Sequence, residues 1–239
     1  MRLPDALPPE SSLAFVCVRA RSGPHLTPQM FAAAGDRVWL ATPTDSLKAR
    51  VLRQRPAVSL YIPGADEAVV VQGLAKVLDP LRPSSLLDAP LDTMRSAAGM
   101  AAYAAANLGD LLDLSLDFVP VRRRALVAVS PESVVEAPVA HDVVVGLLTE
   151  DDGVVALPAS WDPSSNEAVL LGERLGAVLD GPVAVALDRS TGGGPGRKQG
   201  VMHRGTARRT TAGVAVEIER STWWNGTSVG TVHWWRQTE

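Results

Sequence analysis

Short apolar runs, each closed by Gly, Pro or Asp, dominate the hydrophobic pattern of this chain. Their length and their β-branched content are typical of strands. In the first half, strands are expected at 13–18, 38–42, 57–62, 68–77 and 124–129. In the second half, they are expected at 143–148, 153–157, 182–187, 200–209, 214–218 and 227–235. Many short strands with few long helices favour a β-barrel over a doubly wound sheet.

Three segments show helical periodicity instead. Residues 46–54 repeat apolar positions at helical spacing, with Asp45 expected as the N-cap. A longer region rich in Ala and Leu covers 84–112, and 167–179 is expected to form a third helix. The predicted fold class is therefore mainly β with helical insertions (α+β).

The order of elements indicates that one barrel occurs twice in the chain. Three short segments of the first half recur in the second half: 57–62 as 182–187, 72–76 as 204–208, and 131–134 as 219–222. The last pair has a smaller offset, as expected if the insertion at 84–112 is missing from the second copy. We therefore expect a split β-barrel at 1–138 and a degenerate second barrel at 139–239.

Composition and charge narrow the range of functions. The chain has 239 residues, 46% of them hydrophobic and 21% charged, which is ordinary for a soluble globular protein. Its formal net charge of −3 argues against a nucleic-acid partner bound through a basic surface. The sequence shows no signal peptide and no apolar stretch long enough to span a bilayer, so we expect a cytoplasmic protein without a membrane partner.

Cysteine and histidine usage gives no metal site. Cys17 is the lone cysteine, which excludes an intramolecular disulfide and a thiolate metal centre, and its apolar surroundings predict a buried, inert thiol. The four histidines are scattered, without the spacing of a ligand pair. No metal is therefore expected.

One corner of the first half has the composition of a phosphate site. Thr42 ends a predicted strand, and Ser46 and Lys48 open the helix that follows. A phosphate dianion needs a cation and several donors, and a lysine, two hydroxyls and a helix N-terminus supply these together.

The stretch 12–78 resembles the pyridoxamine 5′-phosphate oxidase-like family of FMN-binding split barrels. In that family a strand ending in Thr is followed by a Ser-x-Lys-Ala helix, as at Thr42 and 46–49 here. A Pro-x-Val-Ser strand and a Val-x-Gly-x-Ala strand come next, as at 56–59 and 71–75. Residues 124–136 are similar to the family's closing strand.

The resemblance implies a cofactor and the residues that hold it. FMN is the leading cofactor, and a deazaflavin, whose phosphate would use the same corner, is the alternative. The phosphate would lie on Thr42, Ser46 and Lys48. The isoalloxazine ring would contact the backbone of 25–28, and the next strand would contribute one further side chain. The implied cofactor-binding residues are His25, Leu26, Thr27, Pro28, Thr42, Ser46, Lys48 and Gln72.

Three functions are compatible with such a cofactor. The chain could be a flavin-dependent oxidoreductase acting on a small organic molecule, a deazaflavin-dependent reductase, or a flavin- or ligand-binding protein without catalysis. His233 and Arg236 do not match the arrangement that holds substrate phosphate in pyridoxamine phosphate oxidases. That specific activity is not expected, and no catalytic residue is assigned.

The second half lacks the phosphate pattern. In place of Ser46 and Lys48 it offers Asn166 and Glu167, and an acidic helix start would repel a phosphate. We expect this half to supply the partner face of the site, which gives a monomeric pseudo-dimer or a homodimer. The glycine-rich segment 192–198 lacks the spacing of a phosphate-binding loop and is expected to connect two strands.

Overall fold

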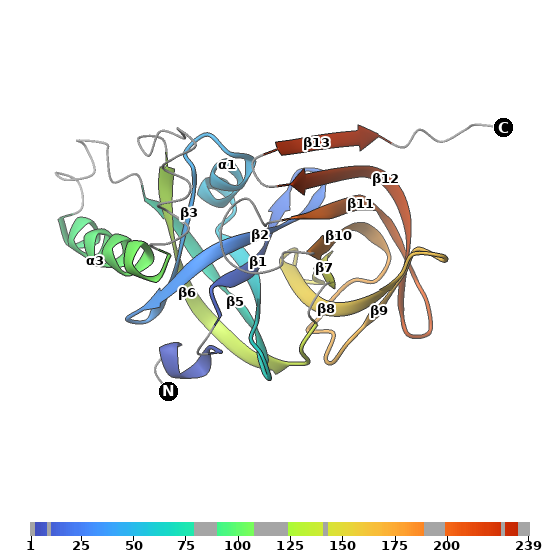
Figure 1. Ribbon diagram of the computed structural model, residues 1–239, viewed down its shortest axis with the longest axis horizontal. Coiled ribbons are helices and arrows are strands. Elements are labelled where there is room, and N and C mark those ends of the chain that lie inside the picture. Colours follow the sequence, from blue (N-terminus) through green and yellow to red (C-terminus); the bar gives the residue numbers. More distant parts are fainter. Residues whose placement is uncertain are drawn as a thin grey trace.

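Two β-barrels lie side by side in the computed structural model of this chain (Figure 1). The structure describes residues 3–8, 11–78, 90–107, 124–140, 143–188, 199–225 and 228–233. Strands make up most of these residues, so the mainly β expectation is confirmed.

The first barrel closes through six antiparallel strands in the order β1-β2-β3-β6-β5-β4. These strands are β1 (Leu13–Ala20), β2 (Gly23–Ala34), β3 (Arg37–Pro43), β4 (Ala57–Pro63), β5 (Ala68–Leu78) and β6 (Arg124–Ala137). Among the described residues, the helices of this half are the 3-10 helix η1 (Leu3–Ala6), α1 (Leu47–Gln54) and α3 (Pro90–Ala106). Val16, Leu40 and Leu60 are among the apolar side chains that fill the barrel.

The second barrel repeats this order. Its strands are β7 (Val143–Leu148), β8 (Val154–Asp162), β9 (Glu167–Leu170), β10 (Gly181–Asp188), β11 (Gln199–Arg209) and β12 (Gly213–Asn225). They follow one another as β7-β8-β9-β12-β11-β10, and β10 pairs with β7 to close the ring. One more strand, β13 (Ser228–His233), pairs with β12. Two barrels with the same strand permutation establish a duplicated split barrel.

Strand register fixes which residues of the two copies correspond. Val58 pairs with Gly73 in the first barrel, and Val183 pairs with Gly205 in the second. The predicted matches of 57–62 with 182–187 and of 72–76 with 204–208 are therefore confirmed. Both copies also carry a register shift just before this glycine.

The third predicted match is wrong by one residue. Gly73 lies opposite Pro131, whereas the corresponding Gly205 lies opposite Ile218. Pro131 therefore corresponds to Ile218 and not to Glu219. Short polar segments beside a bulge contain too little apolar pattern to fix such a register.

Strand β1 is buried on both faces. Its even-numbered residues pack inside the first barrel, while Phe15 and Cys17 pack against the second. Burial raises the pKa of the Cys17 thiol to about 12, in line with the predicted inert cysteine. Across the same interface, Ser59 Oγ accepts from the backbone N–H of Ala156 at 3.1 Å. A Cβ added at Gly146 of β7 would lie 2.9 Å from Cys17 Sγ, so the barrels approach very closely here.

Two of the predicted helices are present in the structure. Helix α1 lies where expected, but its N-cap is Ser46 and not Asp45. Helix α3 covers the outside of the first barrel, where a Cβ at Gly99 would meet the ring of the buried Trp39. It occupies the described part of the region predicted at 84–112.

The helix predicted at 167–179 is wrong. Glu167–Leu170 forms β9, which pairs with β8 and β12. Beyond it, residues 171–180 have irregular backbone, in which Gly172, Leu175 and Gly176 have positive φ angles. A run of left-handed residues cannot continue a right-handed helix. The second barrel therefore has no helix in the place of α1, and Asn166 and Glu167 are not the counterparts of Ser46 and Lys48.

Some sequence-based predictions lie outside the described residues. These are the connection at 192–198, the first and last residues of the strand expected at 227–235, and Arg236. Within the described part of the chain, no helix is both long and apolar enough to cross a membrane.

Candidate functional site

The first barrel is split between β2 and β3. These strands pair only from Phe31–Ala34 to Arg37–Leu40, so the first eight residues of β2 have no β3 partner. The last residues of β3 pair with β6 alone. Several buried polar side chains surround this split, close to the N-terminus of α1.

The corner predicted from the sequence forms at the end of β3. Thr42 Oγ1 lies 3.0 Å from Ser46 Oγ. The Ser46 hydroxyl also accepts from the backbone N–H of Ala49 at 3.1 Å, which caps α1. The two hydroxyls and the helix N-terminus therefore lie together, as the sequence indicates.

Lys48 points into the protein. Its side chain is buried, and its amino group donates to Gln29 Oε1 of β2. The Gln29 amide donates in turn to the carbonyl oxygen of Ala41, which ties the two sides of the split together. Burial lowers the pKa of Lys48 to about 7, and none of the described carboxylates forms an ion pair with it.

A row of polar side chains runs along the same face of β2. His25 and Thr27 lie opposite Val18 and Val16 of β1, and Gln29 continues the row. Directly paired residues of antiparallel strands share a face, so these side chains point to the interior of the first barrel. Thr27 Oγ1 is buried and has no hydrogen-bond partner among the described residues.

The second barrel contributes one side chain to this row. Arg204 of β11 donates to His25 Nδ1, and its Nε is buried without an acceptor in the described part of the chain. Burial lowers the pKa of this guanidinium to about 10, and the charge of Arg220 acts in the same direction. Arg204 takes the position in the second barrel that Gln72 has in the first.

Other sequence-predicted residues lie apart from this row. Gln72 pairs with Ser59 on the outer face of the barrel and accepts from Ser133 Oγ at 3.3 Å. Leu26 is buried against the second barrel, and Pro28 shares its side of β2. The structure thus places Thr42, Ser46 and Lys48 at one corner, and His25 and Thr27 on the same face of β2 as Gln29, the partner of Lys48. Gln72 and the side chains of Leu26 and Pro28 lie on other faces.

Two residues of the row were missed from the sequence. Gln29 could have been found, because it continues the alternation of His25 and Thr27 by two residues. Arg204 could not be placed from local pattern, although its match to Gln72 gave its strand position. Its approach to His25 depends on how the barrels pack.

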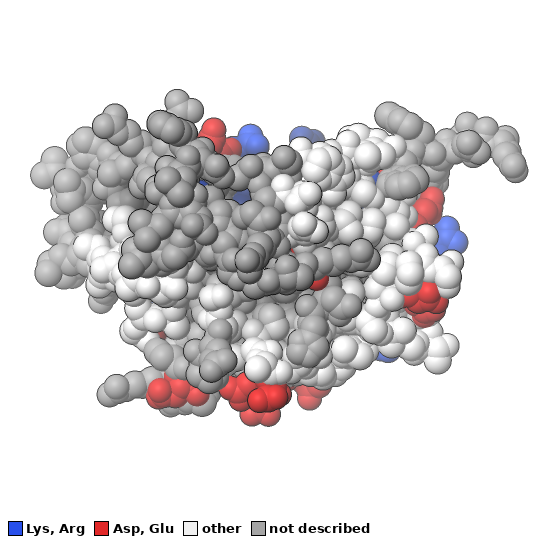
Figure 2. Space-filling model, viewed as in Figure 1, with Lys and Arg blue, Asp and Glu red and all other residues white. Residues whose placement is uncertain are grey.

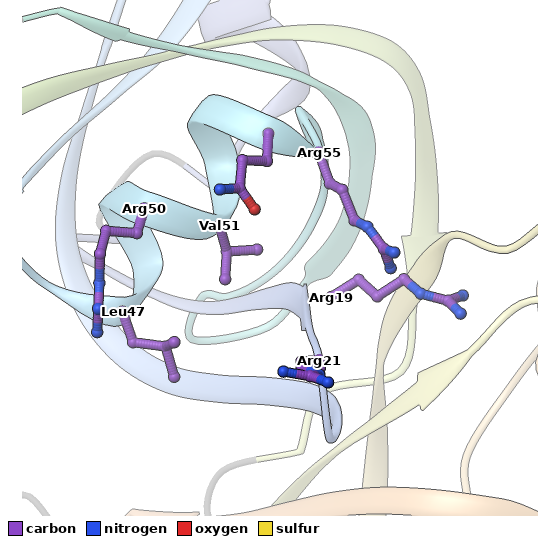
Figure 3. A pocket seen from close by; sticks show the side chains of 7 residues that line it. Arg19, Arg21, Leu47, Arg50, Val51 and Arg55 are labelled. Carbon is purple, nitrogen blue, oxygen red and sulfur yellow. The ribbon is translucent and has the colours of Figure 1, made fainter.

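A separate cavity of about 540 Å³ opens beside α1 (Figure 3). It lies between one face of this helix and the turn that joins β1 to β2. Its lining residues are Arg19, Arg21, Leu47, Arg50, Val51, Gln54 and Arg55. In Figure 2, acidic side chains lie along the lower edge of the molecule, and others lie at its right edge and at the top beside basic side chains.

No group of three or more His, Cys, Asp or Glu side chains gathers among the described residues in a way that could hold a metal ion. The chemistry of the split is that of a cationic and hydroxyl-bearing site instead. Its side chains fit an anion with hydrogen-bonding groups.

Comparisons with known proteins give likenesses of fold. No family model and no curated protein matches the sequence. Similar structures include a conserved hypothetical protein from Mycobacterium tuberculosis (20% identity, 53% of this chain and 77% of that chain, TM-score 0.38). A protein from Listeria innocua named after pyridoxamine 5′-phosphate oxidase is 14% identical over 52% of this chain and 87% of its own, with a TM-score of 0.34. An F420 reductase is 18% identical over 52% of this chain and 88% of its own length, with a TM-score of 0.38.

The class of protein itself is defined by the strand order. The chain is a duplicated split β-barrel, in which the first copy carries Lys48 in helix α1 and the second copy has no helix at the corresponding described positions between β9 and β10.

Proposed function

We propose that this chain binds a flavin-type nucleotide, with FMN the first candidate, in the split between β2 and β3 of the first barrel. The observation that carries the proposal is the Lys48 amino group, buried beside the N-terminus of α1 with no carboxylate partner among the described residues. An amine in such a place is poorly stabilised in its charged form. A phosphate would supply the missing charge, and it would raise the pKa of Lys48 from about 7.

Unpaired polar atoms support a ligand in the same region. Thr27 Oγ1 and Arg204 Nε are both buried without partners in the described chain, on the row that leads from the Lys48 corner. Buried polar groups are normally hydrogen-bonded. Two buried polar atoms without partners near one split therefore support a ligand that forms hydrogen bonds with them. Gln29 would release Lys48 Nζ or share it with the phosphate.

The backbone of β2 provides the expected place for the ring. Residues 25–28 have β1 on one edge and no paired strand on the other among the described residues. Their backbone groups on the free edge are available to the polar atoms of an isoalloxazine ring, and such contacts tune flavin electronics. A bound flavin would supply hydride or electron transfer, and the protein would position it against a small organic substrate.

The first experiment is to identify what the purified protein holds. We expect a visible flavin spectrum and release of FMN on denaturation, identified by its mass. Release of a deazaflavin nucleotide would keep the same corner but change the cofactor. Turnover of a reduced nicotinamide or deazaflavin donor would then separate an oxidoreductase from a binding protein without catalysis.

The second experiment tests the corner itself. Lys48→Ala should weaken FMN binding by about 1.5–3 kcal/mol, the range for a hydrogen bond to a charged group. Lys76→Ala is the matched control, because it removes the same charge from an exposed position on β5. A dissociation constant for FMN that is the same in wild type and Lys48→Ala would exclude this corner as the phosphate site.

A further inference from the structure

The cavity beside α1 is lined by four cationic side chains from two elements. Arg19 and Arg21 belong to the end of β1 and its turn, while Arg50 and Arg55 belong to α1 and its C-cap. Figure 3 shows Arg55 extending from the end of the helix toward Arg19, with Arg21 on the turn beside them.

Most of this positive charge has no acidic partner in the part of the chain that the structure describes. Arg19 pairs with the Asp152 carboxylate and also donates to the Asp152 carbonyl oxygen at 2.7 Å. The side chains of Arg21, Arg50 and Arg55 make no hydrogen bond or ion pair with another described residue. Like charges around one cavity repel one another, so an anion placed among them is stabilised by each.

The helix face also carries an apolar wall. Leu47 and Val51 line the cavity next to Arg50, and Leu47 is 37% exposed although it is a large apolar side chain. The cavity-lining positions of α1 recur at intervals of three and four residues, as expected for one face of a helix. A ligand that fits both parts has an anionic end and an apolar body.

We propose that this cavity binds an organic diphosphate of the nucleoside diphosphate class, at a site separate from the Lys48 corner. Guanidinium groups form paired hydrogen bonds with phosphate oxygens, and arginines from two elements can hold adjacent phosphates. The nucleoside would pack on Leu47 and Val51. Lys48 lies on the buried face of α1 and does not line the cavity, so the two sites are distinct.

Titration calorimetry with ADP, inorganic pyrophosphate and triglutamate tests the proposal. ADP should bind more tightly than pyrophosphate, because only ADP has a body for the apolar wall. Arg50→Ala and Arg55→Ala should each raise the dissociation constant for ADP about tenfold, as expected for the loss of a charge-assisted hydrogen bond. Arg208→Ala, which removes an exposed arginine of β11, should leave it unchanged.

Several results would overturn the inference. Absence of ADP binding would exclude the site. An equal loss of ADP affinity in Arg50→Ala and Arg208→Ala would show that ADP responds only to the net charge of the protein. Tighter binding of triglutamate than of ADP would show that the cavity prefers an oligocarboxylate, and the proposed diphosphate ligand would be wrong. Lys48→Ala should leave the ADP dissociation constant unchanged, so failure of the flavin proposal would be seen separately from failure of this one.

Discussion

At the scale of single residues, Lys48 combines two properties that rarely occur together. Its side chain is buried as deeply as the surrounding apolar core, yet its only described partner is the neutral amide of Gln29. A lysine in this setting is stabilised as the neutral amine. Its pKa of about 7 in the folded chain compares with 10.5 in an unperturbed lysine.

This difference predicts a pH dependence of stability. Between pH 10.5 and about 7 the unfolded chain binds a proton at Lys48 that the folded chain does not bind. The contribution of Lys48 to the free energy of unfolding therefore rises with pH across this window and changes little below it. Lys48→Met should remove that rise, whereas Lys76→Met, at an exposed position, should keep it. Denaturant titrations at several pH values measure this, and equal slopes in wild type and Lys48→Met would contradict it.

At the scale of elements, α1 depends on its first turn. The helix has only eight residues, too few to be stable alone, so its cap and its packing must hold it in place. The cap is also part of the proposed phosphate corner. Loss of the Ser46 hydroxyl would therefore affect both the helix and the contact with Thr42.

We expect Ser46→Ala to lower the free energy of unfolding by about 1 kcal/mol, the usual cost of removing an N-cap side chain. Asp45→Ala is the control, because Asp45 precedes the cap and its side chain has no described hydrogen bond. Chemical denaturation of both variants measures the difference. A larger loss for Asp45→Ala than for Ser46→Ala would show that the cap is wrongly assigned.

Local pattern predicted most elements, and its failures have local causes. Apolar β-branched runs gave most strands because both faces of such strands are buried. The segment 23–34 gave no clear strand, since Pro24 and Pro28 interrupt it; these prolines are tolerated where β2 has no partner on its second edge. The error at 167–179 has another origin, because the four residues of β9 are a strand through their pairing with β8 and with β12, which comes from far along the sequence.

At the scale of the whole molecule, the two barrels touch through small residues. Gly23, at the start of β2, has a φ of 114°, and a Cβ added there would overlap the side chain of Pro182 on β10. Duplication itself could be predicted from the order of elements. The meeting of Arg204 with His25 could not, because nothing in a linear sequence gives the relative placement of two barrels.

Two glycine substitutions measure this close approach. Gly35→Ala places a side chain at a φ of 66° with no atom nearby, and should cost about 1 kcal/mol of backbone strain. Gly23→Ala adds the overlap with Pro182 and should cost a further 1–3 kcal/mol, typical of overpacking. Thermal unfolding of both variants tests this. Equal destabilisation would mean that the barrels separate here without penalty.

The contact between Cys17 and Gly146 shows what covalent fusion permits. Cys17 lies opposite Ser59 in the first barrel, and Gly146 lies opposite Ala184, the counterpart of Ser59, so Cys17 and Gly146 occupy the same position in the two copies. In an assembly of identical subunits, a residue on the symmetry axis must fit against itself. Here the thiol meets a glycine, which leaves room that a second thiol would not. Because the two copies are joined in one polypeptide, the two sides of this axis need not be identical, and they carry a thiol on one side and a glycine on the other.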